Sequence, residues 1–176
     1  MRWAIDLTHS QITFAVKHLG ISTVRGTFDT FSGTIDEQDG VISGADISID
    51  VASLNTGTAQ RDDHLRSADF FDVANHPTAT FRLLSAQRSG DALTAQGELT
   101  IRGVTKPVTL TGEIGGPAKD PWGNTKVSAT LSTKLPRKEW GLTWNATLET
   151  GGLLVSEDVK LDIELQAAPA MAEATA

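Results

Sequence analysis

The chain has 176 residues, of which 39% are apolar and 21% are charged, as is ordinary for one globular domain with a sizeable core. Its formal net charge of −7 and isoelectric point near 5.0 argue against binding to a nucleic-acid backbone, which requires a basic face. Because cysteine is absent, the sequence excludes disulfide bonds, a thiolate nucleophile and a zinc site built on cysteines.

The N-terminal segment MRWAIDLTHS lacks the apolar stretch of a signal peptide and continues directly into strand-like sequence. No later run approaches the roughly 20 apolar residues of a membrane-spanning helix. The sequence as written therefore predicts a cytoplasmic protein without stable membrane insertion. A chain from which a leader had been removed would look similar, and that protein would be periplasmic.

Apolar and polar residues alternate with a period of two along much of the chain, which indicates antiparallel strands with one dry and one wet face. The clearest segments, in chain order, are SQITFAVKH, ADISIDV, LTAQGELTI, PVTLTGEI, KVSATLST and VKLDIEL. The alternation predicts a common interior for Phe14, Val16, Ile47, Ile49, Leu99 and Leu131. It predicts solvent-facing positions for Thr13, Ser48, Glu98 and Thr130.

Turn signals separate the strands, and only one stretch, residues 58–67, has the character of a helix, with Thr56 or Thr58 as its cap. The expected turns are Asp39-Gly40, Ser89-Gly90-Asp91, Gly115-Gly116-Pro117, Gly123-Asn124 and Gly151-Gly152. Residues 1–165 are expected to form a single domain, and residues 166–176 a disordered tail.

So many short strands at even spacing predict a β-sandwich or a closed barrel. Small residues recur among large ones on the inward faces, as a hollow, ligand-holding barrel requires: Ala95, Gly97, Gly112 and Ala129. A packed sandwich core tolerates the same pattern. The alternation by itself favours the hollow barrel and leaves the packed sandwich open.

The stretch RDDHLRSADFFDVANHPTATF, residues 61–81, raises the question of a metal site. Asp62 and His64 are two residues apart on the expected helix and therefore point to different sides, so they converge poorly on an ion. The interpretation without a metal gives Arg61, Asp62 and Asp63 to the solvated face of the helix. It places Leu65, Phe70 and Phe71 as an apolar plug at one side or end of the barrel, with Asp72 and Asn75 in a turn and Phe81 pointing inward.

Catalytic motifs are weak. Ser10 beside His9 is not a triad, GxSxG is missing, and no glycine-rich phosphate loop occurs. His18 ends an apolar inward row, and it is expected either as a structural histidine or as a polar contact to a lipid head group together with Arg25.

Several motifs together resemble the YceI family of lipid-binding proteins. They are WAIDLTHSQITFAVKH, VRGTFDTFSGTI, RDDHLRSADFFDVANHPTATF, LTIRGVTKPVTL, DPWGNTKV, RKEWGLTWN and VSEDVKLDIEL. The resemblance runs from about Trp3 to Leu165 and depends most on the first and third motifs. The chain departs from the family pattern at Trp140, where phenylalanine is usual, and at Pro136.

The resemblance implies an all-β, lipocalin-like antiparallel barrel of eight strands with one short helix, whose apolar interior holds a polyisoprenoid or a similar long-chain lipid. The expected function is to carry or store a polyprenyl lipid or isoprenoid quinone, with no enzymatic activity, no cofactor, no metal and no nucleic-acid partner. Two alternatives remain open, an enzyme acting on the bound lipid and a stress-related interaction module with a collapsed interior, and the resemblance leaves a homodimer open. The expected lipid-contacting residues are Ile12, Phe14, Val16, His18, Arg25, Phe28, Ile47, Ile49, Val51, Leu65, Phe70, Phe71, Phe81, Leu99, Leu131, Trp140 and Trp144.

Overall fold

The computed structural model describes residues 1–149 and 151–170, and these residues form eleven strands, one α-helix and three short 3-10 helices. The strands are β1 (Arg2–Ile5), β2 (Gln11–His18), β3 (Ser22–Phe28), β4 (Phe31–Gln38), β5 (Val41–Asp50), β6 (Leu54–Asn55), β7 (Thr78–Ser89), β8 (Ala92–Ile101), β9 (Val104–Lys119), β10 (Thr125–Pro136) and β11 (Asp158–Pro169). The helices are η1 (Leu7–His9), η2 (Val51–Ser53), α1 (Ala59–Arg66) and η3 (Arg137–Trp140).

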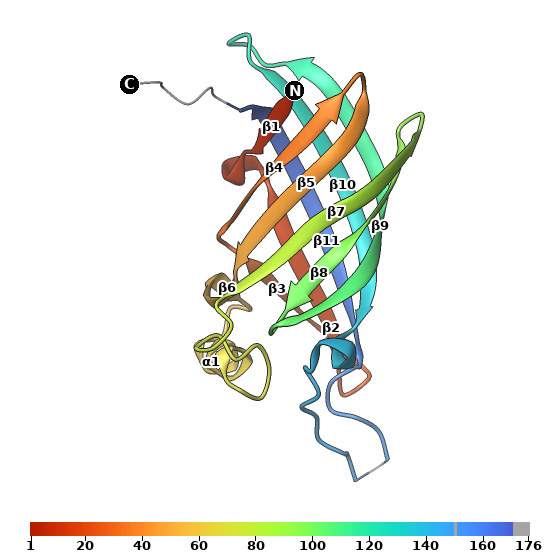
Figure 1. Cartoon of the computed structure of the whole chain (residues 1–176). Helices are drawn as coiled ribbons and strands as arrows, with labels where there is room; N and C mark the ends of the chain where they lie inside the picture. The colour runs from red at the N-terminus through yellow and green to blue at the C-terminus, as the bar shows by residue number, and fades with distance from the viewer. Residues whose placement is uncertain (150, 171–176) are drawn as a thin grey trace.

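The sheet closes on itself through β1, which pairs with both β4 and β11. The closed ring runs β1-β4-β5-β7-β8-β9-β10-β11, eight antiparallel strands in all (Figure 1). The expected eight-stranded barrel is therefore confirmed. Closure leaves no free edge around this ring, which removes the aggregation hazard of an open sheet.

The wall beside β11 is built from two strands in succession. β1 pairs with β11 at residues 167–169, and β2 pairs with it at residues 160–164. Between them the chain turns through η1, where the Asp6 carboxylate accepts a hydrogen bond from the Thr8 N–H. From β2 the wall continues into β3 and the short β6.

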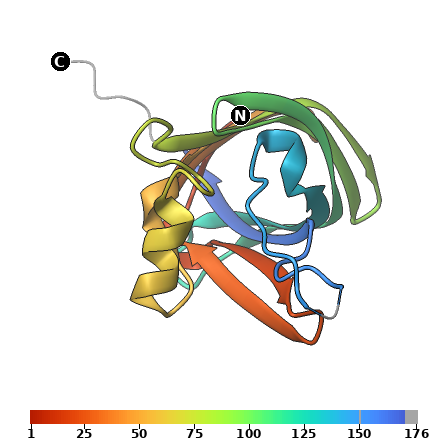
Figure 2. The same cartoon turned by 90° about the horizontal axis from the view of Figure 1, so that it is seen from below.

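Helix α1 lies at the end of the barrel opposite β1, close to β6 (Figure 1). Seen from below, α1 flanks the barrel mouth, while η3 and the segment that follows it cross the opening (Figure 2). The part of the chain that the structure describes contains no helix long and apolar enough to cross a membrane.

The strand register agrees with the sequence prediction. The six positions expected to face inward are all buried or half-buried and line the interior, whereas the four expected to face water line neither interior chamber described below. Because side chains alternate along a strand, a slip of one residue would have exchanged these two sets.

Two of the small inward residues, Gly97 and Gly112, do not have the predicted effect: neither lines a chamber, and a Cβ atom on Gly112 would lie 1.8 Å from the Thr130 backbone oxygen. A Cβ atom on Gly97 would lie 2.4 Å from the Phe81 ring, and one on Gly26 would lie 2.4 Å from the Phe14 ring. These glycines therefore make room for aromatic rings from a neighbouring strand instead of leaving space empty. Ala95 and Ala129 do border an interior chamber, as a hollow barrel requires.

Two further predictions are corrected. Gly115-Gly116-Pro117 is not a turn, because β9 continues through it to Lys119 opposite a register shift in β10, and the turn is formed by residues 120–124. Residues 166–169 are not a disordered tail, because β11 includes them and β1 and β10 pair with them. Ala170 continues this order, since its N–H donates to the Arg2 backbone oxygen at 2.8 Å, and residues 171–176 of the expected tail lie outside the described residues.

Candidate functional site: an apolar cavity in two chambers

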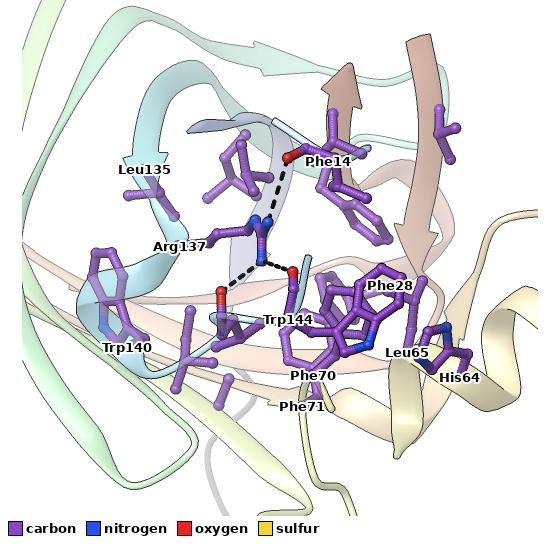
Figure 3. Close-up of a pocket in the computed structure, with 18 of the residues that line it drawn as sticks. Phe14, Phe28, His64, Leu65, Phe70, Phe71, Leu135, Arg137, Trp140 and Trp144 are labelled. Carbon is purple, nitrogen blue, oxygen red and sulfur yellow. Dashed lines mark hydrogen bonds between the residues drawn. The ribbon is translucent and has the colours of Figure 1, made fainter. Parts of the chain in front are cut away.

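The barrel encloses two neighbouring cavities. The α1-end chamber has a volume of about 270 Å³ and lies beneath α1, η3 and the segment after η3 (Figure 3). The far chamber, of about 310 Å³, lies toward the turns at the opposite end. Four apolar side chains line both chambers and so form the boundary between them: Ile12, Ile49, Leu99 and Leu161.

Aromatic rings line the α1-end chamber in two groups, which come together at the neighbouring residues Phe70 and Phe71. Phe14 of β2 packs on Phe28 of β3 with ring centroids 5.2 Å apart, and Phe28 meets the edge of Phe71 at 5.8 Å. Phe70 and Trp144 follow, with centroids 5.4 Å apart. The wall therefore joins strands, the segment after α1 and the segment after η3.

Trp140 forms another part of this wall and is only 1% exposed. Its indole N–H donates to the backbone oxygen of Leu99 at 3.0 Å, which satisfies the polar end of the ring. This hydrogen bond fixes the indole ring, which belongs to η3, against β8.

Arg137 brings a charge into this apolar setting. Its side chain is 5% exposed and its guanidinium donates to the backbone oxygens of Ser156, Leu142 and Trp144 at 2.7 to 2.9 Å. The guanidinium also lies 5.9 Å from the centre of the Phe70 ring. Burial lowers the pKa of Arg137, partly offset by the nearby charge of Glu157, and the group remains a cation at any physiological pH. Arg137 thus holds the segment after η3 against the chamber.

The charged stretch at residues 61–81 differs from its predicted arrangement. Asp62 is not solvated: it is 7% exposed and accepts hydrogen bonds from the Thr56 N–H at 2.9 Å and from the Thr56 hydroxyl. Arg61 lines the chamber and donates to Thr56 as well. The chain before the helix folds back onto its first turn, which periodicity cannot reveal. Thr58 precedes the helix without a side-chain capping bond.

The rest of that stretch follows the interpretation without a metal. The His64 ring contacts the Asp69 carboxylate at 2.9 Å, whereas Asp62 is bonded to Thr56. His64 and Asp62 therefore do not converge on a common point. The Asn75 side chain donates to the Asp72 carboxylate, forming the expected turn. Within residues 1–149 and 151–170, no group of three or more histidine or acidic side chains is arranged to hold a metal ion.

Most of the expected contact residues lie around the cavity. Those that line the α1-end chamber are Ile12, Phe14, Val16, His18, Phe28, Ile49, Leu65, Phe70, Phe71, Leu99, Trp140 and Trp144. Those that line the far chamber are Ile12, Ile47, Ile49, Phe81, Leu99 and Leu131. Their contact with a lipid stays a prediction.

Two expected contact residues lie elsewhere. Arg25 is exposed and pairs with Ala15, whose side chain is on the outer face of β2, so Arg25 points away from the cavity. Val51 is buried in the core beside η2 and lines neither chamber. Arg25 is on the outer face because it is an odd number of residues from the inward Val24 and Phe28, a parity that the sequence already contained.

Sequence reasoning missed other lining residues. Leu161 and Ile163 were on an alternating segment and could have been assigned by the same rule. Arg137, Leu154 and Val155 carry no periodic signal, because they belong to η3 and an irregular segment.

Comparison with known proteins shows where this architecture recurs. A family model described as the YceI-like domain matches residues 3–167. Protein YceI of Salmonella arizonae is 40% identical over 160 residues, covering 90% of this chain and 81% of that protein. The crystal structure of the Campylobacter jejuni YCEI protein superposes with a TM-score of 0.76 at 34% identity, covering 88% of this chain and 90% of that one. A polyisoprenoid binding domain from Saccharophagus degradans has a TM-score of 0.73 at 17% identity, over 94% and 97% of the two chains, a likeness of fold.

Proposed function

We propose that this chain, which belongs to the YceI-like domain family, binds a long-chain isoprenoid lipid inside its barrel and carries or stores it. The observation that supports the proposal most directly is the almost wholly apolar lining of two neighbouring chambers within one closed barrel. The polyisoprenoid binding of the Saccharophagus degradans domain, which shares the fold, is consistent with a ligand of this chemistry.

Burial of the lipid's hydrocarbon tail inside the barrel provides enough free energy for binding. At about 0.8 kcal/mol per buried CH₂, a lipid of roughly forty carbons has a nominal gain near 30 kcal/mol. Net affinity stays below a ceiling of about 18 to 21 kcal/mol, because ordering the lipid and the protein costs entropy. An apolar wall is therefore sufficient for tight binding without specific contacts to a head group.

Polar side chains line both chambers, and those of the α1-end chamber include N–H donors that a head group can use. His18, Arg61 and Arg137 line this chamber, and all three side chains carry N–H donors. We infer that a quinone or polyprenyl head group lies at this end and that the tail extends toward the far chamber. His18 is the candidate for direct contact, since Arg137 is engaged by backbone oxygens and part of the Arg61 guanidinium donates to Thr56.

Organic extraction of the purified protein followed by mass spectrometry tests the proposal. We expect an isoprenoid series in an amount comparable to the protein, and much less in an equal mass of a control protein from the same cells. A folded protein that carries no lipid would contradict the proposal and support an interaction module with an empty interior. Conversion of the extracted lipid when it is returned to the protein would instead indicate an enzyme.

A further inference from the structure

We propose that the β2–β3 turn and the adjoining outer wall of the barrel dock on the surface of an anionic phospholipid bilayer. Three exposed apolar side chains lie at this end of the molecule: Leu19, Ile21 and Leu153. Ile21 is 83% exposed. The Leu19 N–H donates to the backbone oxygen of Leu154 at 2.9 Å, so the turn and the segment bearing Leu153 are held side by side (Figure 2).

The backbone conformation of this turn does not favour leucine at position 19, so the turn itself does not explain why an apolar side chain is found there. Leu19 and Gly20 have φ values of 56° and 70°, and the Ile21 N–H closes the turn on the His18 oxygen. Two positive φ values define the turn type in which Asn-Gly or Asp-Gly is preferred. The β4–β5 turn of this chain follows that rule with Asp39-Gly40. A bulky leucine in the left-handed region is disfavoured, yet it stands here exposed at the tip.

Basic side chains line the outer wall directly behind this tip. Arg25 of β3 pairs with Ala15 of β2, Ala15 pairs with Lys160 of β11, and Lys160 pairs with Lys134 of β10. All three basic residues are exposed on one cross-strand row, and Lys17 is exposed on the same face two residues before Leu19. Among the described residues, only Lys160 of these four has a carboxylate within 4 Å, Asp162 at 3.7 Å.

Charge and shape together select the occupant. The protein as a whole carries a net charge of −7, and Asp158, Asp162 and Glu164 share the outer face of β11 with Lys160, yet Lys17, Arg25 and Lys134 have no carboxylate within 4 Å among the described residues. Apolar tips that enter the interface, flanked by basic side chains near lipid phosphates, are the features that bind peripheral proteins to anionic membranes. The apolar tip also adjoins the α1-end chamber, since His18, Leu154 and Val155 line it. Docking here would bring the chamber to the membrane.

Sedimentation with vesicles tests this surface. We expect the protein to bind vesicles of phosphatidylglycerol and phosphatidylcholine, to bind pure phosphatidylcholine vesicles far less, and to be released by high salt, which shortens the range of the electrostatic attraction. Leu19→Asn/Ile21→Ser should lower binding by on the order of tenfold or more, because the buried apolar area is lost. Leu19→Asn also supplies the preferred Asn-Gly turn, so the thermal midpoint of the variant should not fall.

Arg25→Gln/Lys160→Gln should weaken binding to the anionic vesicles by roughly 25-fold, about fivefold for each basic residue near the surface. Two matched controls should leave binding unchanged. Trp122→Ser removes a side chain that is also 83% exposed but lies in the β9–β10 turn at the opposite end. Lys106→Gln/Lys119→Gln makes the same change of charge on β9.

Equal loss of binding in the controls and in the test variants would overturn the proposal, as would a wild-type protein that ignores both vesicle types. If the wild type is a dimer that Leu19→Asn/Ile21→Ser dissociates, and no vesicles bind, the surface is a contact between copies and the proposal is wrong. The assay does not depend on what the barrel contains, so its failure would leave the proposed cavity function standing.

Discussion

At the residue scale, a substitution at Ile49 distinguishes a hollow, lipid-carrying barrel from a packed core. Ile49 lines both chambers, while its neighbour Ser48 is exposed on the outer face of the same strand. A charge placed in a solid core has no solvent and costs several kcal/mol. A charge placed on a cavity wall can be hydrated once the ligand leaves, so the same substitution has different consequences in the two cases.

We predict that Ile49→Asp leaves a folded barrel that carries little or no lipid. Ser48→Asp, the matched control one residue away, should keep both fold and lipid because its side chain faces water. Circular dichroism and lipid extraction of the two variants give the measurement. Unfolding of Ile49→Asp alone would indicate a packed interior, and undiminished lipid would show that Ile49 is not part of the binding wall.

At the element scale, α1 and the segment after it form one part of the cover of the α1-end chamber, beside η3 and the segment that follows η3. Their attachment depends on polar contacts, since the helix is made mostly of polar residues and Leu65 is its one large apolar side chain. Asp62 ties its first turn to Thr56, and Arg66 donates to the oxygens of Ala52 and Leu54. Arg102 of the β8–β9 turn donates to the Phe70 oxygen at 2.8 Å. The cover is therefore held at both ends by charged side chains that bind backbone.

We predict that Asp62→Ala loosens this cover more than it destabilises the barrel. Removing the buried acceptor leaves the Thr56 N–H and hydroxyl without their partner, at a cost of about 1–3 kcal/mol. Amide hydrogen exchange should accelerate in residues 59–66 while β8 and β9 stay protected. Gln60→Ala removes an exposed polar side chain of the same helix and should change neither; a uniform acceleration across the barrel would contradict a local role for Asp62.

At the scale of the whole molecule, the ring of strands is completed by the shortest strand in it, β1, with four residues. Charged contacts support this closure. Arg2 pairs with Asp36 of β4 at 2.8 Å, and the Trp3 indole donates to Glu37 at 3.1 Å. Asp6, just after β1, pairs with Lys126 of β10 at 3.5 Å and with His9.

The hydrogen bond from Arg2 lowers the pKa of Asp36, and the hydrogen bond from His9 lowers that of Asp6. A carboxyl group whose pKa is lower in the folded state stabilises the fold above its unfolded pKa, and that stability is lost as pH falls. We therefore expect the closure at β1 to weaken below about pH 4. The effect should be modest, because both groups are solvated.

Hydrogen exchange of β1 amides measured across this pH range gives the test. Asp36→Asn should show a flatter pH dependence than the wild type, since the substituted side chain does not titrate. An unchanged pH dependence in Asp36→Asn would show that this carboxylate does not contribute to closure.

The sequence by itself determined the strand character, the inward and outward faces, the single helix and the resemblance to its family. Period-two alternation is a local property, so Phe14, Ile49 and Leu99 could be assigned to the interior from their own segments. The turn at Asp39-Gly40 could likewise be predicted from these two residues alone. The same parity would have placed Arg25 outside, and overlooking it was an error of reasoning rather than a limit of the sequence.

The alternation could not show whether the sheet closes, because it is the same in a barrel strand and a sandwich strand. The family resemblance implied closure, and the tertiary structure shows it in the pairing of β1 with β11. The burial of Asp62 and Arg137 was also beyond local pattern. Each is a charged side chain whose partners belong to irregular segments, and such segments acquire positions only when the barrel brings them together. Side-chain periodicity reports which face of a strand is dry, whereas the volume enclosed by those faces depends on which strands become neighbours.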